Sequence, residues 1–258
     1  MLATNIDHIA ICVSLATEVD LGRIERFLAL VASSGTGEAL LRNSPLSWES
    51  GAEPLVVLTK ADLVDDGEFV RADVEQVAPG VTVLVVSADT GEGMDVLRAC
   101  VPGSTALIGQ SGAGKSTLTN ALAGTDVMTA QQTRAGDEKG RHTTTTRELI
   151  PLPGGVVIDT PGLRGVGLYG GEGVAQVFSD IEELAENCRF HDCGHQSEPG
   201  CAVAAALEDG TLPQRRMESY LKLQRENEWI ASRSDARLAA ERVRKWKIIT
   251  KSAGKIRP

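Results

Sequence analysis

The stretch of sequence that decides the fold is Gly109-Gln-Ser-Gly-Ala-Gly-Lys-Ser116, which fits the pattern G-x-x-x-x-G-K-[ST]. The apolar run TALI (105–108) precedes it, and the helix-compatible run STLTNALAG (116–124) follows it. In a strand–loop–helix setting, such glycines let backbone N–H groups surround phosphate oxygens, and the helix N-terminus adds its dipole. A glycine-rich turn with a chance lysine would not need that setting. The pattern therefore predicts a nucleotide site.

The loop and the first helical turn supply the phosphate-binding candidates. Lys115 is expected to bridge the β- and γ-phosphates and so to take part in catalysis, and Ser116 is expected to ligate Mg²⁺. The full set of candidates is Gly109, Gln110, Ser111, Gly112, Ala113, Gly114, Lys115, Ser116 and Thr117.

Outward from the loop, short apolar runs alternate with helical patterns. Runs without polar alternation suit strands buried on both faces, and strands with intervening helices form a mostly parallel, doubly wound sheet. The predicted strands are Ile6–Leu15, Pro54–Thr59, Val81–Ser87, Thr105–Ile108 and Val156–Ile158, with Arg147–Leu152 as an edge strand. A helix is predicted within Asp20–Leu41, where apolar residues recur at helical spacing.

Two motifs at predicted strand ends indicate guanine. In Thr59-Lys-Ala-Asp62, the carboxylate of Asp62 can accept from guanine N1–H and from the exocyclic amine, which adenine cannot match. The aliphatic stem of Lys60 can pack over the purine. In Ser87-Ala88, a backbone N–H can reach guanine O6. We therefore expect Thr59, Lys60, Asp62, Ser87 and Ala88 to bind the base.

A third motif, Asp159-Thr-Pro-Gly162, follows the strand VVI (156–158). The carboxylate of Asp159 would lie at the strand end facing the phosphates, where an indirect Mg²⁺ ligand belongs, and Gly162 can offer its N–H to a γ-phosphate. Each motif alone is weak, and their joint occurrence at strand ends beside a phosphate loop is a strong signal.

These fragments resemble the five GTPase signature motifs, in the order fourth, fifth, first, second, third. The chain resembles the circularly permuted small ribosomal subunit biogenesis GTPases of the RsgA/YjeQ/EngC family, from Asn5 to about Asn227. Gly140-Arg-His-Thr-Thr-Thr145 matches the switch I segment. The resemblance implies a P-loop GTPase domain that hydrolyses GTP to GDP on the 30S subunit and its 16S rRNA in late maturation, with release coupled to hydrolysis. It also implies a cytoplasmic monomer that uses GTP/GDP and Mg²⁺.

The chain departs from the family pattern at two positions. The guanine motif begins with Thr59, where asparagine normally ties the base to the phosphate loop, and we expect threonine to hold the base less firmly. Leu163 stands where Ras-like GTPases place a water-orienting glutamine. The family resemblance then makes His142 the expected catalytic helper, the alternative being an exposed loop histidine. One of Thr143, Thr144 and Thr145 is expected to complete the Mg²⁺ shell, with Thr144 as the candidate.

The five cysteines form an odd set, three of them within fourteen residues. Cys188-x4-Cys193-x-His195-x5-Cys201 offers three thiolates and one imidazole, a full tetrahedral set for one structural Zn²⁺. The alternative is three buried cysteines and a surface histidine, but this spacing belongs to the family pattern. His191 is the competing imidazole and falls outside that pattern. Cys12 and Cys100, far from these ligands in sequence, are expected in the core.

After about residue 165, the alternation of strand and helix patterns gives way to helical patterns alone. Residues 1–165 are predicted to form the permuted α/β GTPase domain, and residues 166–258 a small, mostly helical zinc-binding domain with a basic tail. Helices are predicted at Val174–Ala185, Gly200–Leu207 and Pro213–Ser232. Family members carry an amino-terminal OB-fold before the GTPase domain, and this chain begins where that barrel ends. It is therefore expected to be a fragment or a form that lacks the module.

Charge is unevenly distributed. The net charge is −9, with 26 basic and 35 acidic residues, but residues 233–258 hold nine of the basic and two of the acidic ones. The acidic total argues against nucleic-acid binding along the whole surface. The basic tail is expected either to contact rRNA phosphates or to be a solvated, disordered segment. No run of 18 apolar residues and no signal peptide is present, so neither a membrane nor a secreted location is expected.

Two other function classes remain open. The chain could be a zinc-stapled RNA-binding assembly module that holds GTP as a structural ligand with little turnover, which Thr59 and Leu163 favour. An ATP-dependent enzyme would require Asp62 to play no part in base selection.

Overall fold

The computed structural model describes residues 6–33, 52–127, 148–159, 172–196 and 198–234. The chain divides into two compact units, Met1–Val166 and Gly167–Pro258. This division lies one residue from the predicted domain boundary after residue 165. Each unit is described by itself below.

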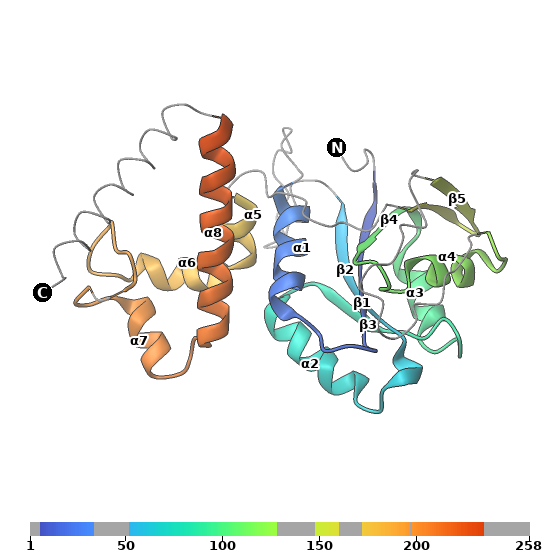
Figure 1. Ribbon diagram of the computed structural model, residues 1–258, viewed down its shortest axis with the longest axis horizontal. Helices are drawn as coiled ribbons and strands as arrows, with labels where there is room; N and C mark the ends of the chain where they lie inside the picture. The colour runs from blue at the N-terminus through green and yellow to red at the C-terminus, as the bar shows by residue number, and fades with distance from the viewer. Residues whose placement is uncertain (1–5, 34–51, 128–147, 160–171, 197, 235–258) are drawn as a thin grey trace, which may run out of the picture. The chain divides into compact units, whose positions relative to one another are not determined.

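The first unit is built on a six-stranded sheet with the order β3-β2-β1-β4-β6-β5 (Figure 1). Only β5 and β6 pair in the antiparallel direction, and the other neighbours are parallel. The strands are β1 His8–Ser14, β2 Glu53–Thr59, β3 Thr82–Val85, β4 Gly103–Gly109, β5 Glu148–Leu152 and β6 Gly155–Asp159. The mostly parallel sheet, and the edge strand among its members, are thus confirmed.

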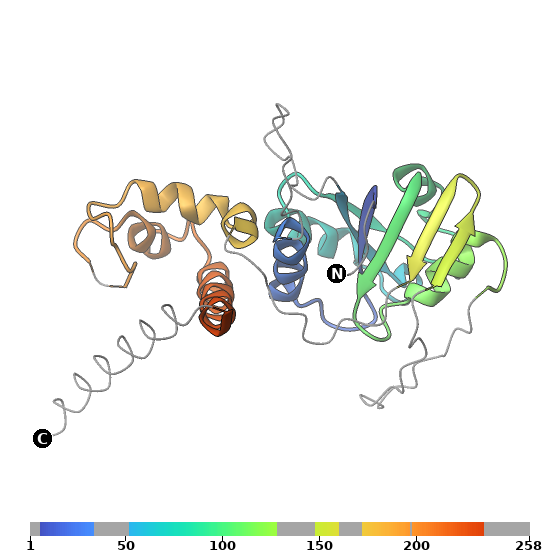
Figure 2. The same ribbon diagram turned by 90° about the horizontal axis from the view of Figure 1, so that it is seen from above.

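Helices cover both faces of this sheet because its central strands are apolar on both sides. In β2, every residue from Pro54 to Thr59 is buried. The helices of this unit are α1 Leu21–Ser33, η1 Ala61–Leu63 (one 3₁₀ turn), α2 Gly67–Val77, α3 Met94–Cys100 and α4 Lys115–Ala123. Helices α1 and α2 lie on one face and α3 and α4 on the other (Figures 1 and 2). The predicted helix at Asp20–Leu41 is α1, and its residues 34–41 lie outside the described part.

The strand order creates a switch point between β1 and β4. From β1 the chain moves outward to β2 and β3, and from β4 the sheet continues to β6 and β5 on the other side. In open parallel sheets, ligands bind beyond the carboxyl ends of the strands at such a point. The phosphate loop follows β4, and the guanine motifs follow β2 and β3, so the fold brings the predicted site residues to this edge.

The second unit is helical, with α5 Glu172–Val177, α6 Ser179–Glu186, α7 Ala202–Glu208 and α8 Gln214–Ser234. The prediction of one helix over Val174–Ala185 is wrong, because the chain breaks at Phe178, which has φ −108° and ψ 35°. The carbonyl of Phe178 accepts from the N–H groups of Ile181 and Glu182 and so starts α6. The break buries the Phe178 ring completely.

A buried arginine holds these helices together. The Arg216 guanidinium, only 5% exposed, donates to both carboxylate oxygens of Asp180 at 2.6 and 2.7 Å and to the Val177 carbonyl at 2.8 Å. It also lies 4.7 Å from the centre of the Phe178 ring. A buried charge needs such pairing, and this one joins α8 to α5 and α6. Nearby, burial and the bond to Glu182 raise the pKa of Tyr220 above its ordinary value.

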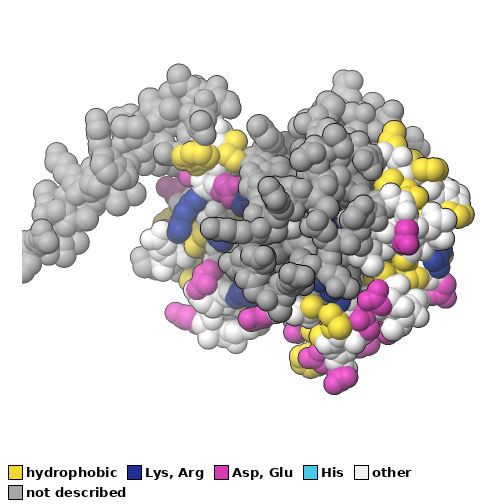
Figure 3. Space-filling model, turned by 45° about the vertical axis from the view of Figure 1, so that its right-hand side comes forward, with side chains coloured by type: hydrophobic (Ala, Val, Ile, Leu, Met, Phe, Trp, Pro, Cys, Tyr) yellow, Lys and Arg dark blue, Asp and Glu magenta, His cyan; other side chains and the backbone are white. Residues whose placement is uncertain are grey.

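The surface is chemically mixed on the face drawn in Figure 3, where the described Lys and Arg side chains lie among acidic and apolar ones. The most exposed large apolar side chains of the described residues are Phe69 at 73% and Leu149 at 71%. Among the described helices, none has the length and apolar character needed to cross a membrane.

Candidate functional site

Two glycines let the phosphate loop pass close to the ends of neighbouring strands. Gly109 ends β4, and a Cβ there would lie 2.4 Å from the Cys12 carbonyl oxygen of β1, closer than any real Cβ contact. Gly114 precedes α4 in the left-handed conformation, with φ 78°. A Cβ on Gly114 would lie 3.4 Å from the Thr59 hydroxyl oxygen at the end of β2. The loop therefore runs against the strand ends, and a side chain at either glycine would not fit this path unchanged.

Lys115 directs a buried positive charge to this loop. Lys115 is the first residue of α4, and its Nζ donates to the carbonyls of Gly109 at 3.0 Å and Gln110 at 2.7 Å. The residue is 8% exposed. The first turn of α4 contains Ser116 and Thr117 and no acidic residue. An ammonium group and a helix N-terminus at one place form an anion site of the kind that binds phosphate groups.

Thr59 joins the guanine motif to the phosphate loop. Its hydroxyl lies 2.9 Å from the Ala113 carbonyl oxygen and 3.2 Å from the Val13 carbonyl oxygen, and the residue is 4% exposed. The shorter side chain that replaces asparagine therefore still reaches the loop.

The remaining guanine-motif residues lie beside one another. Ser87, fully buried after β3, donates its hydroxyl to Asp62 Oδ1 at 2.6 Å, a short bond to a carboxylate. Lys60 is left-handed, with φ 63°, and its Cε would lie 4.0 Å from a Cβ on Gly114, so its stem passes near the loop. Ala88, next to Ser87, is half-buried. The fold thus assembles three motifs that are separate in sequence.

The other predicted residues are described in part or not at all. Asp159 ends β6 and pairs with Leu107 of β4, so the chain leaves the sheet close to the start of the phosphate loop. His142, Thr144 and Gly162 lie outside the described residues, as does Leu163. Their roles stay predictions.

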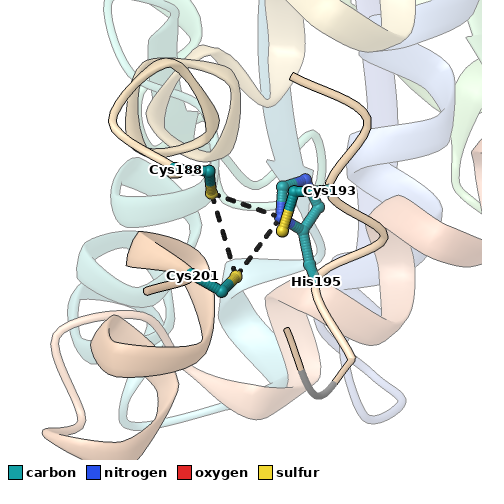
Figure 4. A group of neighbouring side chains, drawn as sticks. All are labelled: Cys188, Cys193, His195 and Cys201. Carbon is teal, nitrogen blue, oxygen red and sulfur yellow. Dashed lines mark hydrogen bonds between the residues drawn. The ribbon is translucent and has the colours of Figure 1, made fainter. Parts of the chain in front are cut away.

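The second candidate site is the cluster of Cys188, Cys193, His195 and Cys201 (Figure 4), whose ligand atoms all lie within 4.8 Å of one another. Cys188 Sγ is 3.8 Å from Cys201 Sγ, and His195 Nδ1 is 3.6 Å from the first sulfur and 3.5 Å from the second. Around a tetrahedral Zn²⁺, bonds of about 2.3 Å to sulfur and about 2.0–2.1 Å to nitrogen put two sulfurs about 3.8 Å apart and a sulfur and a nitrogen about 3.6 Å apart. These three distances, between Cys188, Cys201 and His195, fit such an ion.

Loops and helix ends position these four donors. Cys188 follows α6, Cys193 and His195 lie in the next loop, and Cys201 caps α7, where its Sγ accepts from the Ala204 N–H at 3.3 Å. Of the two histidines in this segment, His195 lies with the three thiols, whereas His191 is exposed and does not join the cluster.

The two cysteines predicted in the core differ from each other. Cys12 is buried in β1, as predicted. Cys100 ends α3 half-buried, because the helix end reaches the surface, and the prediction of a core position is wrong there.

Glu198 is a site residue that the sequence did not reveal. Its Oε1 accepts from the Gly194 N–H and its Oε2 from the Gln196 N–H, both at 2.9 Å. These two amides flank His195, which is left-handed with φ 56°. One carboxylate thereby fixes the turn that carries His195. Its signal in sequence is slight, because an acid within such a loop resembles any surface acid.

The thiols influence one another. Burial raises the pKa of Cys188, but hydrogen bonds from the Val203 and Ala202 N–H groups and from the thiols of Cys201 and Cys193 together bring it below its ordinary value. The His195 N–H lowers the pKa of Cys193, whereas burial and the other two thiols raise it, to about 11 overall. Crowded thiols resist carrying several negative charges together, and a cation among them removes that cost.

The sequence of this chain is similar to those of known proteins. The model of the family described as RsgA GTPase matches residues 1–169. The small ribosomal subunit biogenesis GTPase RsgA of Streptomyces coelicolor is 61% identical over 247 residues, covering 93% of this chain and 63% of that protein. RsgA 1 of Listeria monocytogenes is 44% identical over 256 residues, covering 98% and 69%. The chain thus spans less than two thirds of the length of its Streptomyces coelicolor relative.

Solved structures are similar as well. YjeQ from Thermotoga maritima superposes with a TM-score of 0.59 at 27% identity, covering 86% of this chain and 72% of that one. YloQ, described as a circularly permuted GTPase, superposes with a TM-score of 0.55 at 25% identity, covering 86% and 68%.

Proposed function

We propose that this chain, which belongs to the circularly permuted RsgA GTPase family, binds guanine nucleotides with Mg²⁺ and hydrolyses GTP to GDP and phosphate. The observation that carries the proposal is the pair of contacts across the site. Thr59 bonds to the phosphate loop at Ala113, and Ser87 bonds to Asp62. Together they support one site that could hold a base and a phosphate chain at once.

Each group has a distinct task in this proposal. Lys115 and the start of α4 hold the β- and γ-phosphates, and Asp62 accepts from guanine N1–H and the exocyclic amine. Ser116 and Thr144 would hold Mg²⁺ directly and Asp159 indirectly, and the ion would offset charge on the phosphates. Lys115 now donates to two loop carbonyls, and it exchanges those bonds for phosphate oxygens on binding.

His142 is proposed to help orient the attacking water, because Leu163 has no polar group to do so. His142→Ala is expected to lower the rate of hydrolysis by about 10²–10⁴-fold, the usual contribution of a general acid or base. Nucleotide affinity should change less than about twofold. Single-turnover hydrolysis and equilibrium binding measure the two effects. His191→Ala, at an exposed histidine of the second unit, is the matched control, and normal turnover in His142→Ala would remove His142 from catalysis.

We further propose that Cys188, Cys193, His195 and Cys201 hold one structural Zn²⁺ per chain. Four protein donors leave no open position for substrate. The ion would cross-link the loop between α6 and α7, in a unit whose hydrophobic core is small.

Glu198→Ala tests how the loop positions His195. Loss of the carboxylate frees two amides and relaxes a left-handed turn, so zinc affinity should fall by about 10–100-fold, as when supporting contacts of metal ligands are removed. Competition with a chromophoric chelator measures the change. Glu186→Ala, an exposed acid at the end of α6, should retain its zinc. Equal affinity in both variants would contradict the role of Glu198.

The partner is proposed from the relatives, which are named small ribosomal subunit biogenesis GTPases. We expect the chain to act in the cytoplasm as a monomer, on the 30S subunit and its 16S rRNA in late maturation, with release coupled to hydrolysis. Multiple-turnover hydrolysis with 30S subunits, with 50S subunits and with neither tests this. Stimulation by 30S alone is expected. Nucleotide binding without turnover in all three would favour an assembly module that holds GTP as a structural ligand.

A further inference from the structure

The hydroxyl of Thr59 faces two carbonyl oxygens and has one proton to give. It lies 2.9 Å from the Ala113 oxygen and 3.2 Å from the Val13 oxygen. A threonine hydroxyl is a single O–H donor, while both neighbours accept only. Whichever carbonyl receives the proton, none remains for a third acceptor.

Burial makes this arrangement costly to change. Thr59 is 4% exposed, and Ala113 is equally buried within the loop. Turning the hydroxyl toward a ligand would leave a buried carbonyl without its donor, at a cost of about 1–3 kcal/mol. The hydroxyl therefore stays with the loop when a nucleotide binds.

The acceptors that guanine presents beside its five-membered ring are N7 and O6. Each can accept a hydrogen bond from a donor of the protein or from water. An asparagine amide has two N–H groups and a carbonyl, so it can bond the loop and still donate to the base. Threonine at this position cannot do both.

We propose that this chain recognises guanine without a side-chain donor to N7 from residue 59. Thr59 is a positioning residue that fixes the phosphate loop against the guanine motif. Asp62, oriented by Ser87, reads N1–H and the exocyclic amine, and the Ala88 backbone N–H reads O6. The inference rests on the proposed function, in which the bound base is guanine.

Nucleotide analogues test the proposal on the unmodified chain. Equilibrium competition against a fluorescent GDP compares GDP, 7-deaza-GDP, IDP and ADP. GDP and 7-deaza-GDP should bind within about twofold, because the missing N7 is not read. IDP lacks the amine that Asp62 accepts from, and one lost bond to a charged group weakens it by about 10–150-fold. GDP binding at least fivefold tighter than 7-deaza-GDP would overturn the inference.

Substitutions at Thr59 supply a second, independent reading. Thr59→Asn should create a preference for GDP over 7-deaza-GDP of about fivefold, one neutral hydrogen bond. Thr59→Val, of similar shape without the hydroxyl, should weaken both nucleotides by a similar factor and leave their ratio unchanged. Thr59→Ser should restore much of the affinity lost in Thr59→Val. A changed ratio in Thr59→Val would show that the hydroxyl contacts the base.

The controls separate this inference from the proposed function. If GDP and ADP bind equally, guanine recognition itself is absent and the proposed function fails. If GDP binds far better than ADP and 7-deaza-GDP binds poorly, only the inference fails. Thermal unfolding of each variant without nucleotide identifies a misfolded protein, and the series on the unmodified chain needs no variant.

Discussion

Removing the metal from the cysteine–histidine cluster, or substituting Cys201→Ser, is expected to unfold the unit Gly167–Pro258 and to leave nucleotide binding by Met1–Val166 intact. Zinc binding in small domains contributes about 10–16 kcal/mol, comparable with the whole stability of a domain, about 5–15 kcal/mol. Cys201 is buried and also caps α7. A serine hydroxyl can still cap α7, so Cys201→Ser removes the thiolate ligand and keeps the helix cap.

Circular dichroism and GDP binding together test this prediction. Far-UV circular dichroism should report loss of helix after chelation, with recovery when Zn²⁺ is restored, while GDP affinity stays within about twofold. Cys100→Ser is the matched control, because Cys100 is half-buried at the end of α3 and outside the cluster. A chain that elemental analysis finds free of metal, yet that keeps its full helical signal, would contradict a structural role for the ion.

Asp62→Asn is expected to turn the nucleotide preference from guanine to xanthine. The Asp62 carboxylate offers acceptors to two guanine donors, and two charge-assisted bonds of about 1.5–3 kcal/mol each correspond to about 10²–10⁴-fold in affinity. An amide offers a carbonyl oxygen that accepts and an NH₂ group that donates, which match N1–H and the second carbonyl of xanthine. Competition binding of GDP and XDP measures the exchange.

Asp65→Asn serves as the control for this substitution, because Asp65 is an exposed acid three residues further along the chain. It should bind GDP and XDP as the unmodified chain does. If Asp62→Asn still prefers GDP strongly, another group selects the base, and the assignment of Asp62 is wrong.

The sequence predicts the fold of the first unit well because its strands are buried on both faces. Runs such as Pro54–Thr59 contain no polar alternation, and few other structures tolerate so many consecutive apolar residues. The second unit is harder to predict. Apolar residues keep helical spacing through Phe178, so the pattern alone does not reveal the break between α5 and α6, which packing of that ring determines.

The candidate sites also contain a part that the sequence predicts and a part that it does not. Motif spacing predicts the phosphate loop, and spacing together with the family resemblance predicts the four members of the cysteine–histidine cluster. Contacts between distant segments are not encoded in spacing. Thr59 and Ala113 are 54 residues apart, and only the paths of β2 and the loop bring them together. Glu198 escaped prediction because its partners are backbone amides, which leave no mark in a sequence.

The order of the strands along the chain, in which a ribosome synthesises them, differs from their order in the sheet. β1, β2 and β3 precede β4, yet β4 pairs directly with β1. About 90 residues separate the end of β1 from the start of β4, which takes about 4–18 s at ordinary translation rates of about 5–20 residues per second. During that interval the edge of β1 that pairs with β4 has no partner strand. The residues proposed to read the base are thus synthesised before those proposed to hold the phosphates, while the unpaired N–H and C=O groups of an apolar strand are open to the wrong partner.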